Sequence, residues 1–583
     1  MPQSADHANA VIEQALGLFA AGQRQRADAL GLSLLNPEPD AFAHNKVGMY
    51  FRRTGRPALA EVHFRKAVAL SPSPVARYNL GNALADLSRF SEAVEAYDQA
   101  IALDPADPRF HTNRGAALLK LHRFTHAIDS LHAALALNPR HITALVTLAD
   151  VLSQSGRIDE SLERLRLALA IEPDRPAATS NYLFTLHYSH RHTADQIAQA
   201  HFDWGRRQAH LARPLPPAPP TRPAGPLRLG FVSGDFRRHS VAFFFEPLLE
   251  GLDRSRCEVF CYCASPLADD TTARLRNLAA HWRDVWPLDD DAAASLIRAD
   301  RLDALVDLAG HTCGHRLGIF ARRAAPLQLT WLGYPDTTGL AAIDFRLTDR
   351  ACDGSETQPW HSERLAFLAG PNWCYRPPAE SPPVPPRPSD VPVTFGCFAQ
   401  FNKINQPTLD LWAGLLSRVP DSRLLIKSPP MADPAVRQRV VARFAAAGID
   451  PTRLDLLGHS PSLVEHLSAI ARADIALDTF PYNGTTLTCE SLWMGVPVVS
   501  LRGPDHRGRT GHSLLHAVGL GDLAAESPEA YVQTAAALAA DAPRLANLRS
   551  GLRHALQASS LLDARRFAEG FVQMLEELAS PVP

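Results

Sequence analysis

The sequence predicts a helical repeat array followed by two Rossmann-like α/β lobes with a cleft between them. Two observations predict this fold class. Residues 48–173 repeat with a period of 33 or 34, and the later sequence alternates short apolar segments with helical ones in two series. Such alternation indicates βαβ units and parallel sheets. A chain of 583 residues is long enough for roughly three to five domains.

The first region keeps a fixed phase over four repeats. A small residue is followed 24 residues later by proline in the pairs Gly48 and Pro72, Gly81 and Pro105, Gly115 and Pro139, and Ala149 and Pro173. This is the tetratricopeptide pattern, in which two antiparallel helices form each repeat and a proline ends the second. We predict repeats over residues 1–212, with a less regular copy around 15–39 and a capping one around 177–208.

Two asparagines share one position of the repeat, Asn79 and Asn113, and Thr147 follows at the same position. Stacked repeats form a superhelix with a concave face, and such surfaces usually bind another molecule. We expect the two amides to hold the backbone of an extended peptide. The alternative is that both side chains are solvated or cap neighbouring turns.

The α/β part divides at two proline-rich stretches. We predict a linker over 213–226, a first lobe over 227–376, an interlobe linker over 377–392 and a second lobe over 393–583 that ends in helices. Ligands of such sheets bind beyond the carboxyl ends of the strands. The expected strands are 227–232, 258–262, 304–308 and 327–332 in the first lobe, and 393–398, 423–427, 454–457, 475–478 and 497–501 in the second.

Composition excludes several classes of function. The net charge of −2 and pI near 6.9 give no sign of nucleic-acid or membrane binding. The eight cysteines form no CxxC pair, which indicates reduced thiols and neither disulfides nor a zinc site. No signal peptide or membrane-spanning segment is recognisable. We therefore expect a cytoplasmic protein.

The segment 477–490 carries the clearest chemical signal. An apolar strand runs into a turn with Pro481 and Gly484, and Thr485 and Thr486 then open a helix. Free N–H groups and hydroxyls at a helix start suit a phosphate. Glu490 lies four residues after Thr486, on the same helix face, where a carboxylate can accept from ribose hydroxyls. The segment thus suggests a nucleotide diphosphate with its sugar; the alternative is a threonine-capped helix without a ligand.

Other polar motifs follow the expected strands, at 233–240, 310–316, 332–339 and 398–403, whereas no GxGxxG or Walker loop is present. In order, the repeats and the motifs DFxxHS, GHT, TWLGYP, FxQxxK and LDTFPYNGTTxTCESLWMGVPVV resemble the nucleocytoplasmic O-GlcNAc transferase family. The resemblance is still closer to the branch that contains the plant SPINDLY protein, whose members include an O-fucosyltransferase. It implies a GT-B fold, a nucleotide-sugar donor, inverting transfer to Ser or Thr, no required metal or cofactor, and repeats that select protein acceptors.

The resemblance implies catalytic roles for Lys403, His239 and Asp300, and a donor contact for Gln400. Lys403 matches the lysine that stabilises the donor diphosphate, where an ammonium lowers the barrier as negative charge grows. Gln400 matches a glutamine that contacts the same group. His239 matches a histidine beside the sugar, which is either the general base or a contact to a sugar hydroxyl. The base can also be a donor phosphate oxygen, or a water relay through Asp300.

The remaining donor-binding residues are implied in the same way. His466 matches a histidine that packs on the nucleobase, and Thr485 and Thr486 match the diphosphate positions. Glu490 matches the ribose carboxylate, which is aspartate in the animal enzymes. Asp307 and His311 follow the SPINDLY-like pattern, with weaker support for His315. The loop near the donor sugar is matched by Leu332, Gly333 and Pro335.

Two further features remain ambiguous. Residues 289–291 contain a DxD sequence, which metal-dependent glycosyltransferases of another fold use, but helix capping explains these carboxylates better. We therefore expect no metal site. Arg507 and Arg509 lie in a glycine-rich stretch after the last strand and either approach the donor phosphates or are solvated.

Three hypotheses for function follow. The first is a protein O-glycosyltransferase that transfers GlcNAc from UDP-GlcNAc, and the second keeps that chemistry but uses GDP-fucose. The third is a tetratricopeptide scaffold with an inactive catalytic half, against which the retention of Lys403, His239, Thr486 and Glu490 argues. Protein acceptors and a nucleotide sugar are the expected partners.

Overall fold

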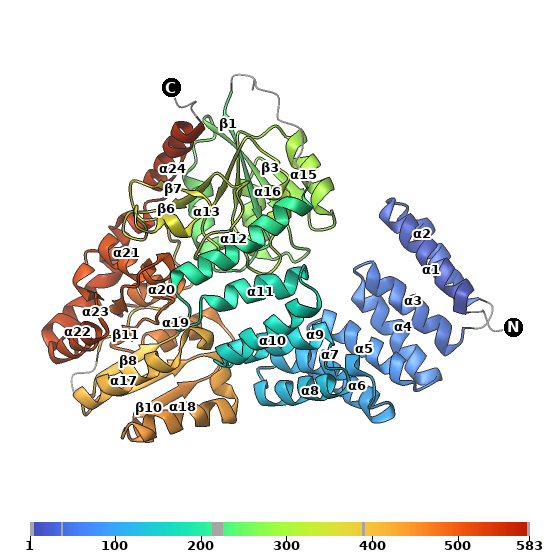
Figure 1. The fold of residues 1–583 in the computed structure, drawn as a ribbon, viewed down its shortest axis with the longest axis horizontal. Helices are drawn as coiled ribbons and strands as arrows, with labels where there is room; N and C mark the ends of the chain where they lie inside the picture. The colour runs from blue at the N-terminus through green and yellow to red at the C-terminus, as the bar shows by residue number, and fades with distance from the viewer. Residues whose placement is uncertain (1–4, 37–38, 213–224, 388–390, 580–583) are drawn as a thin grey trace. The chain divides into compact units, whose positions relative to one another are not determined.

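The computed structural model describes residues 5–36, 39–212, 225–387 and 391–579 (Figure 1). The chain forms two compact units, Met1–Pro173 and Asp174–Pro583. Most of the predicted linker 213–226 lies outside the described residues, as do residues 388–390 of the predicted linker 377–392. None of the described helices is long and apolar enough to cross a membrane.

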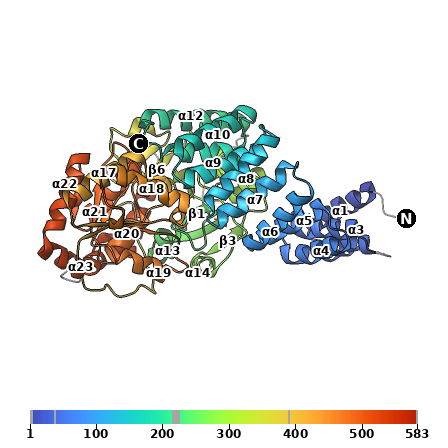
Figure 2. The same ribbon diagram turned by 90° about the horizontal axis from the view of Figure 1, so that it is seen from below.

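The first unit consists of antiparallel helix pairs, and successive helices of the repeats lie side by side (Figure 2). Proline occupies the first turn of α4, α5 and α7, where its missing N–H costs no intrahelical bond. The helices are α1 (Ala5–Ala20), α2 (Arg24–Leu32), α3 (Ala41–Arg53), α4 (Pro57–Leu70), α5 (Pro74–Asp86), α6 (Phe90–Leu103), α7 (Pro108–Lys120), α8 (Phe124–Leu137), α9 (Ile142–Gln154) and α10 (Ile158–Ile171).

The repeating small residues allow the two helices of a pair to pack closely. A Cβ atom at Gly81 would lie 2.6 Å from the ring of Tyr97, and one at Gly115 would lie 2.7 Å from Leu131. Both positions are buried, as is Ala149 in the next repeat. The small residues are therefore required by helix packing, which confirms the predicted repeat architecture.

The first lobe is a parallel sheet with the strand order β3-β2-β1-β4-β5-β6-β7. The sequence predicted β1, β2, β4 and β5, but β3, β6 and β7 were missed because they are four residues long and contain arginine. The strands are β1 (Leu227–Ser233), β2 (Cys257–Cys263), β3 (His281–Asp284), β4 (Ala304–Asp307), β5 (Leu327–Thr330), β6 (Phe345–Thr348) and β7 (Arg364–Phe367).

The second lobe is also a parallel sheet, with the order β10-β9-β8-β11-β12-β13. The two Rossmann-like lobes confirm the predicted fold class. The strands of the second lobe are β8 (Thr394–Cys397), β9 (Arg423–Lys427), β10 (Leu454–Leu457), β11 (Ile475–Leu477), β12 (Val498–Leu501) and the two-residue β13 (Ala524–Ala525), which was not predicted.

Helices surround both sheets, and the last one returns to the first lobe. Helix α24 lies beside α13 (Figure 1), and Phe571 of α24 packs in one core with Phe231 and Phe245. The helices are α13 (Ala242–Gly251), α14 (Asp270–Leu278), α15 (Asp290–Ala299), α16 (Leu317–Ala321), α17 (Gln406–Arg418), α18 (Pro434–Ala446), α19 (Leu463–Ile470), α20 (Thr486–Trp493), α21 (Thr510–Ala517), α22 (Pro528–Ala540), α23 (Ala542–Gln557) and α24 (Ala564–Ala579).

Helices α11 (Pro176–Leu186) and α12 (Ala194–Leu211) belong to the second unit, although we predicted them as the end of the repeat region. Leu183 and Trp204 pack in a core cluster of the first lobe. Helix α12 approaches the lobe so closely that a Cβ atom at Gly205 would lie 1.7 Å from the carbonyl oxygen of Gly339. The helix pair is therefore an integral part of the first lobe, while its hydrophobic pattern resembles that of a repeat.

A chain that begins at Asp174 is expected to fold, because it keeps the whole second unit. A chain that begins at residue 213 lacks α11 and α12, so the Tyr334 hydroxyl loses its two histidine partners and Nη1 of Arg507 loses the carbonyl oxygen of His187. Each buried polar group left unpaired costs about 1–3 kcal/mol. Thermal unfolding of the two truncated chains checks this. Equal melting temperatures would contradict the assignment of the helix pair to the second unit.

Candidate functional site

The second-lobe site is organised by the buried carboxylate of Asp478, which directly follows β11. Its Oδ1 accepts hydrogen bonds from the backbone N–H of Thr479 at 2.9 Å and of Gly484 at 2.7 Å. Its Oδ2 accepts from the hydroxyl of Ser500 in β12 at 2.7 Å. Burial raises the pKa of Asp478 to about 6, although these bonds and Lys403 act in the opposite direction. The carboxylate thus fixes both ends of the loop 479–484.

That loop delivers the chain to the start of α20. Thr485 precedes the helix but makes no side-chain capping bond, so the threonine-capped alternative is not observed. Thr485 and Thr486 are both half-buried, and Glu490 on the next turn is buried. The first N–H groups of a helix lack intrahelical partners and attract anions. The start of α20 therefore offers backbone N–H groups and two hydroxyls to a phosphate.

Lys403 contacts this loop from the segment that follows β8. It lies in a short 3-10 helix, Phe401–Lys403, after β8, and its Nζ donates to the carbonyl oxygen of Asn483 at 2.7 Å. The same nitrogen lies 3.5 Å from the centroid of the Tyr482 ring. Burial lowers the pKa of Lys403 to about 8, against the opposing effect of Asp478. Gln400, at the start of this helix, is exposed.

A second group of side chains meets at Glu490, one turn into α20. The ammonium of Lys427, at the end of β9, donates to Nδ1 of His466 at 2.7 Å. Because an ammonium cannot accept, Nδ1 is the acceptor, and the Nε2–H of His466 faces Oε2 of Glu490 at 3.2 Å. The structure therefore brings together His466 and Glu490, which the sequence singled out, and adds Lys427. Sequence reasoning missed Lys427 because it reads as the last residue of a buried strand.

In the first lobe, His239 follows β1 in a loop that ends near α13. Its Nδ1 accepts from the backbone N–H of Val241 at 3.3 Å and lies 3.6 Å from Oδ2 of Asp235. Burial lowers the pKa of His239, so the ring is neutral near pH 7. In a neutral ring whose Nδ1 accepts, the proton is on Nε2. His239 therefore offers a hydrogen-bond donor at Nε2.

The loop after β5 has a constrained backbone. Leu332 has φ of +76°, a conformation that side-chain-bearing residues rarely adopt. A Cβ atom at Gly333 would lie 2.0 Å from the carbonyl oxygen of Leu308, so no side chain fits there. Pro335 is buried. The loop is thus held close to the segment after β4, at the carboxyl edge of the sheet.

His311 is packed inside the first lobe. Its Nε2 contacts the carbonyl oxygen of Thr338 at 2.8 Å, and its ring centroid lies 4.3 Å from that of Trp204 in α12. Nearby, Asp307 accepts from the N–H of Gly310 at 2.8 Å and from the hydroxyl of Thr330 at 2.9 Å. Burial raises the pKa of Asp307 to about 6. These two residues hold the loops of the first-lobe site, and His311 is too enclosed to contact a ligand in this arrangement.

Asp300 is not brought together with the other predicted catalytic residues. It precedes β4, at the opposite end of that strand from Asp307. Its carboxylate accepts from the hydroxyl of Tyr262 at 2.9 Å and pairs with Arg283 at 3.2 Å. A role for Asp300 in a relay at the carboxyl edge therefore does not fit the structure.

The carboxylates of residues 289–291 take part in structural contacts. Asp289 caps α15 by accepting from Ala292, while Asp290 and Asp291 pair with Arg316 and Arg322. Among the residues that the structure describes, no group of three or more His, Cys, Asp and Glu side chains has metal-site geometry. Residues 289–291 therefore cap a helix, as the capping explanation predicts.

Arg507 and Arg509 contact protein groups. Arg507 donates from Nη1 to the carbonyl oxygen of His187 at 2.9 Å, and Arg509 pairs with Glu356 of the first lobe at 2.7 Å. His506, in the same segment, contacts Asp353 at 2.6 Å. The segment therefore joins the second lobe to the first.

In the first unit, the predicted asparagines contact other amides. Nδ2 of Asn79 donates to Oδ1 of Asn45 at 2.9 Å, and Nδ2 of Asn113 donates to Oδ1 of Asn82 at 2.7 Å and to the hydroxyl of Tyr78 at 3.1 Å. Asn45 lies 34 residues before Asn79, whereas the small residues of these repeats are 33 apart, so the repeat phase did not reveal it. The amides form two separate hydrogen-bonded groups on successive repeats.

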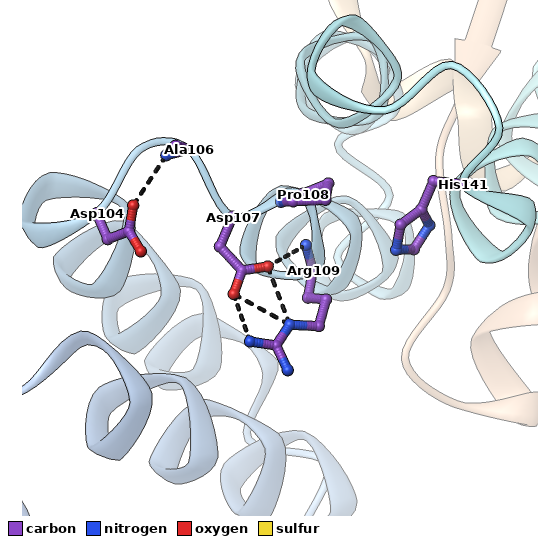
Figure 3. A pocket seen from close by; sticks show the side chains of 6 residues that line it. All are labelled: Asp104, Ala106, Asp107, Pro108, Arg109 and His141. Atoms are coloured by element: carbon purple, nitrogen blue, oxygen red, sulfur yellow. Dashed lines mark hydrogen bonds and ion pairs between the residues drawn. The ribbon is translucent and has the colours of Figure 1, made fainter.

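A shallow hollow on the first unit is lined by helix starts (Figure 3). Asp107 contacts the backbone and guanidinium of Arg109, Asp104 accepts from the N–H of Ala106, and His141 lies apart from both (Figure 3). His141 accepts from the N–H of Ala144 at 3.1 Å. These polar groups serve as helix and turn caps, so the hollow has no sign of a ligand.

Comparison with known proteins shows the family and the repeats of this chain. Residues 192–373 and 387–571 match the model of Glycosyl transferase family 41, and residues 81–122 and 118–180 match tetratricopeptide repeat models. A structure titled as a Thermobaculum terrenum O-GlcNAc transferase mutant is 34% identical, with a TM-score of 0.81, over 87% of this chain and 98% of that one.

Curated relatives match about two thirds of the chain or less. The tomato protein named probable UDP-N-acetylglucosamine–peptide N-acetylglucosaminyltransferase SPINDLY is 41% identical over 401 residues, which cover 68% of this chain and 43% of that protein. The Arabidopsis thaliana protein with the same enzyme name and the designation SEC is 32% identical, over 59% of this chain and 36% of that protein. The chain thus spans less than half the length of these two relatives. The resemblance predicted from the motifs is confirmed.

Replacing Asp478 by Asn is expected to stabilise the fold increasingly as the pH rises from 4 to 7. The pKa of Asp478 is raised from 3.8 to about 6, so folding opposes ionisation, and its stability contribution is largest below pH 4 and is lost as the pH rises through 6. The difference should approach about 3 kcal/mol. Thermal unfolding of wild type and Asp478→Asn over this range measures it.

Asp307→Asn is a parallel case, because burial raises the pKa of Asp307 to about 6 as well. A stability difference that does not change with pH in either variant would contradict the buried, destabilised carboxylates described above.

Proposed function

Because the chain belongs to Glycosyl transferase family 41, we propose that it is an inverting protein O-glycosyltransferase that transfers GlcNAc from UDP-GlcNAc to Ser or Thr of proteins. The observation that carries this proposal is the contact of Lys403 with the loop that leads into α20, with Glu490 one turn into that helix. An ammonium, free helix N–H groups and a ribose-binding carboxylate are the groups that a nucleotide diphosphate requires.

Lys403 would stabilise the leaving group. Breaking the bond between the sugar and the diphosphate leaves negative charge on the phosphate oxygens. A lysine and a helix start that are held in place before the reaction would lower the barrier without reorganisation. Thr485 and Thr486 would donate hydroxyl hydrogen bonds to the same phosphates, and Gln400 is placed one helical turn before Lys403.

Glu490 and His466 would hold the nucleoside. Oε2 of Glu490 faces the Nε2–H of His466, and Lys427 fixes the tautomer of this histidine. The second carboxylate oxygen can then accept from ribose hydroxyls, while the ring of His466 offers a flat surface to the base. No metal ion is needed in this scheme, because Lys403 and the helix start supply the positive potential.

His239 would contact the donor sugar. Its proton on Nε2 supports a role as a hydrogen-bond donor to a sugar or phosphate oxygen more than a role as general base, which needs an unprotonated nitrogen. A donor phosphate oxygen would then accept the proton of the acceptor hydroxyl. Leu332, Gly333 and Pro335 would form the wall beside the sugar.

The acceptor would be a protein bound by the tetratricopeptide unit. Asn79 and Asn113 already hold neighbouring amides in the free protein, so an extended peptide would have to exchange these contacts for its own backbone groups. Cytoplasmic location and the absence of nucleic-acid or membrane partners remain predictions from composition.

A second candidate donor is GDP-fucose. Thr485 and Glu490 follow the SPINDLY-like pattern, and the identity of 41% to the tomato SPINDLY protein exceeds the 32% to the SEC protein. The chemistry at Lys403 would be the same with either donor, so this candidate differs only in the base and the sugar.

Replacing Lys403 by Met is expected to reduce sugar transfer at least about 100-fold, because a preorganised charge at a leaving group is worth that much or more. Purified wild type and Lys403→Met are compared with UDP-GlcNAc and GDP-fucose, by donor hydrolysis and by transfer to proteins. The control is thermal unfolding, in which Lys403→Met should melt at a temperature no lower than wild type.

Lysine-dependent turnover of UDP-GlcNAc supports the first donor, and turnover of GDP-fucose the second. If wild type binds and turns over neither, the inactive scaffold is favoured. Full activity of Lys403→Met would contradict the role of the lysine.

The affinity for a nucleoside diphosphate is expected to fall as the pH rises above 8. Burial lowers the pKa of Lys403 to about 8, so the free protein loses the ammonium above this pH, and affinity should fall by up to about tenfold per pH unit. Calorimetric titration with UDP or GDP from pH 7 to 10 measures this. Lys403→Met should remove the fall; an identical pH profile in this variant would exclude Lys403 as the titrating group.

A further inference from the structure

The connection between α11 and α12 touches both lobes of the second unit. His187 directly follows α11, and its Nε2 contacts the hydroxyl of Tyr334 in the first lobe at 3.0 Å. The carbonyl oxygen of the same residue accepts from Nη1 of Arg507 in the second lobe at 2.9 Å. His187 is buried, and His201 of α12 contacts the same Tyr334 hydroxyl at 2.7 Å. The connection is therefore anchored at fixed points in both lobes.

The next residue extends this contact to the loop before α20. The rings of Tyr188 and Tyr482 are stacked, with centroids 5.7 Å apart and planes inclined by 18°. Tyr188 is only 6% exposed, so the stack is part of the interior. The backbone of Tyr482 is fixed independently, since its carbonyl oxygen accepts from the hydroxyl of Thr479 at 2.7 Å.

The Tyr482 ring has a second partner, Lys403. Its Nζ lies 3.5 Å from the ring centroid, a distance at which an ammonium is attracted by the ring face. Lysine has a long, flexible side chain that loses considerable rotamer freedom when it is held in place. The ring and the carbonyl oxygen of Asn483 are the two contacts that restrict this nitrogen.

We propose that Tyr482 is a positioning residue for Lys403 and that Tyr188 sets the position of the Tyr482 ring. The helix pair that precedes the first lobe would thus help to hold the ammonium at the diphosphate-binding loop of the second lobe. This inference rests on the proposed function only in taking the ligand of Lys403 to be a nucleoside diphosphate.

The alternative is that the two tyrosines only fill space. Loss of packing would lower stability but would not act through one particular ligand group. A positioning role acts through Lys403, so its loss should affect ligands that reach the lysine and spare those that do not. A nucleoside diphosphate carries a second phosphate that the monophosphate lacks. Comparing the affinities of these two ligands therefore distinguishes a positioning role from simple packing.

The test compares Tyr188→Leu, Tyr188→Phe and Tyr182→Leu with wild type. Tyr182 is a half-buried tyrosine on α11 that packs against the first-lobe core, and it serves as the matched control. Affinities for UDP, UMP, GDP and GMP are measured by calorimetry. We expect Tyr188→Leu to weaken binding of the diphosphates about tenfold and binding of the monophosphates little. Tyr188→Phe keeps the stacked ring, so this variant should resemble wild type, and so should the control Tyr182→Leu.

A double-mutant cycle with Lys403→Met supplies the decisive readout. If Tyr188 acts through the lysine, Tyr188→Leu should have no further effect on diphosphate affinity once Lys403 is replaced. Equal losses for mono- and diphosphate, or losses that add fully to those of Lys403→Met, would overturn the proposal.

Thermal unfolding is followed for every variant. If Tyr188→Leu does not fold, Tyr482→Leu is measured in the same cycle and decides by the same criteria. Wild-type protein that binds none of the four nucleotides would instead contradict the proposed function itself.

Discussion

The buried carboxylate of Asp478 is the contact on which the second-lobe site depends. It holds the loop 479–484 at both ends and ties it to Ser500, so the start of α20 has a fixed position. It also supplies the charge that opposes the effect of burial on Lys403. A Cβ atom at Gly511 would lie 2.7 Å from its Oδ2, which explains why glycine is found there. One side chain thus fixes the start of α20 and favours the charged form of Lys403.

The first lobe uses the same device. Asp307 ends β4, is buried, and accepts from the N–H groups of Ala309 and Gly310 and the hydroxyl of Thr330 on the adjacent strand. In each lobe, therefore, an aspartate at a strand end folds the next loop back over the carboxyl edge of the sheet. Burial opposes ionisation of both carboxylates, so each site is built at a cost in stability.

Local signals predicted much of this structure, and contacts between distant segments account for what they missed. The repeats were predictable because each pair of helices needs a small residue at its crossing, as at Gly81. The assignment of α11 and α12 to the lobes was not, because their partners are more than 100 residues away, as for His187 and Tyr334. Lys427 and Tyr188 carry no motif and gain their roles only when folding places them beside His466 and Tyr482.

Lys403 shows how stability and function are linked at this site. Its pKa of about 8 means that folding destabilises its ammonium, and a hydrophobic side chain in its place would fold more easily. An anionic ligand reverses this, because it restores the favourable charge that burial removes and raises the pKa of the lysine again. The free protein is therefore strained at the position where a diphosphate would bind. A half-buried lysine that contacts the loop before a helix start is consequently better evidence for an anion site than the fold alone, which many unrelated functions share.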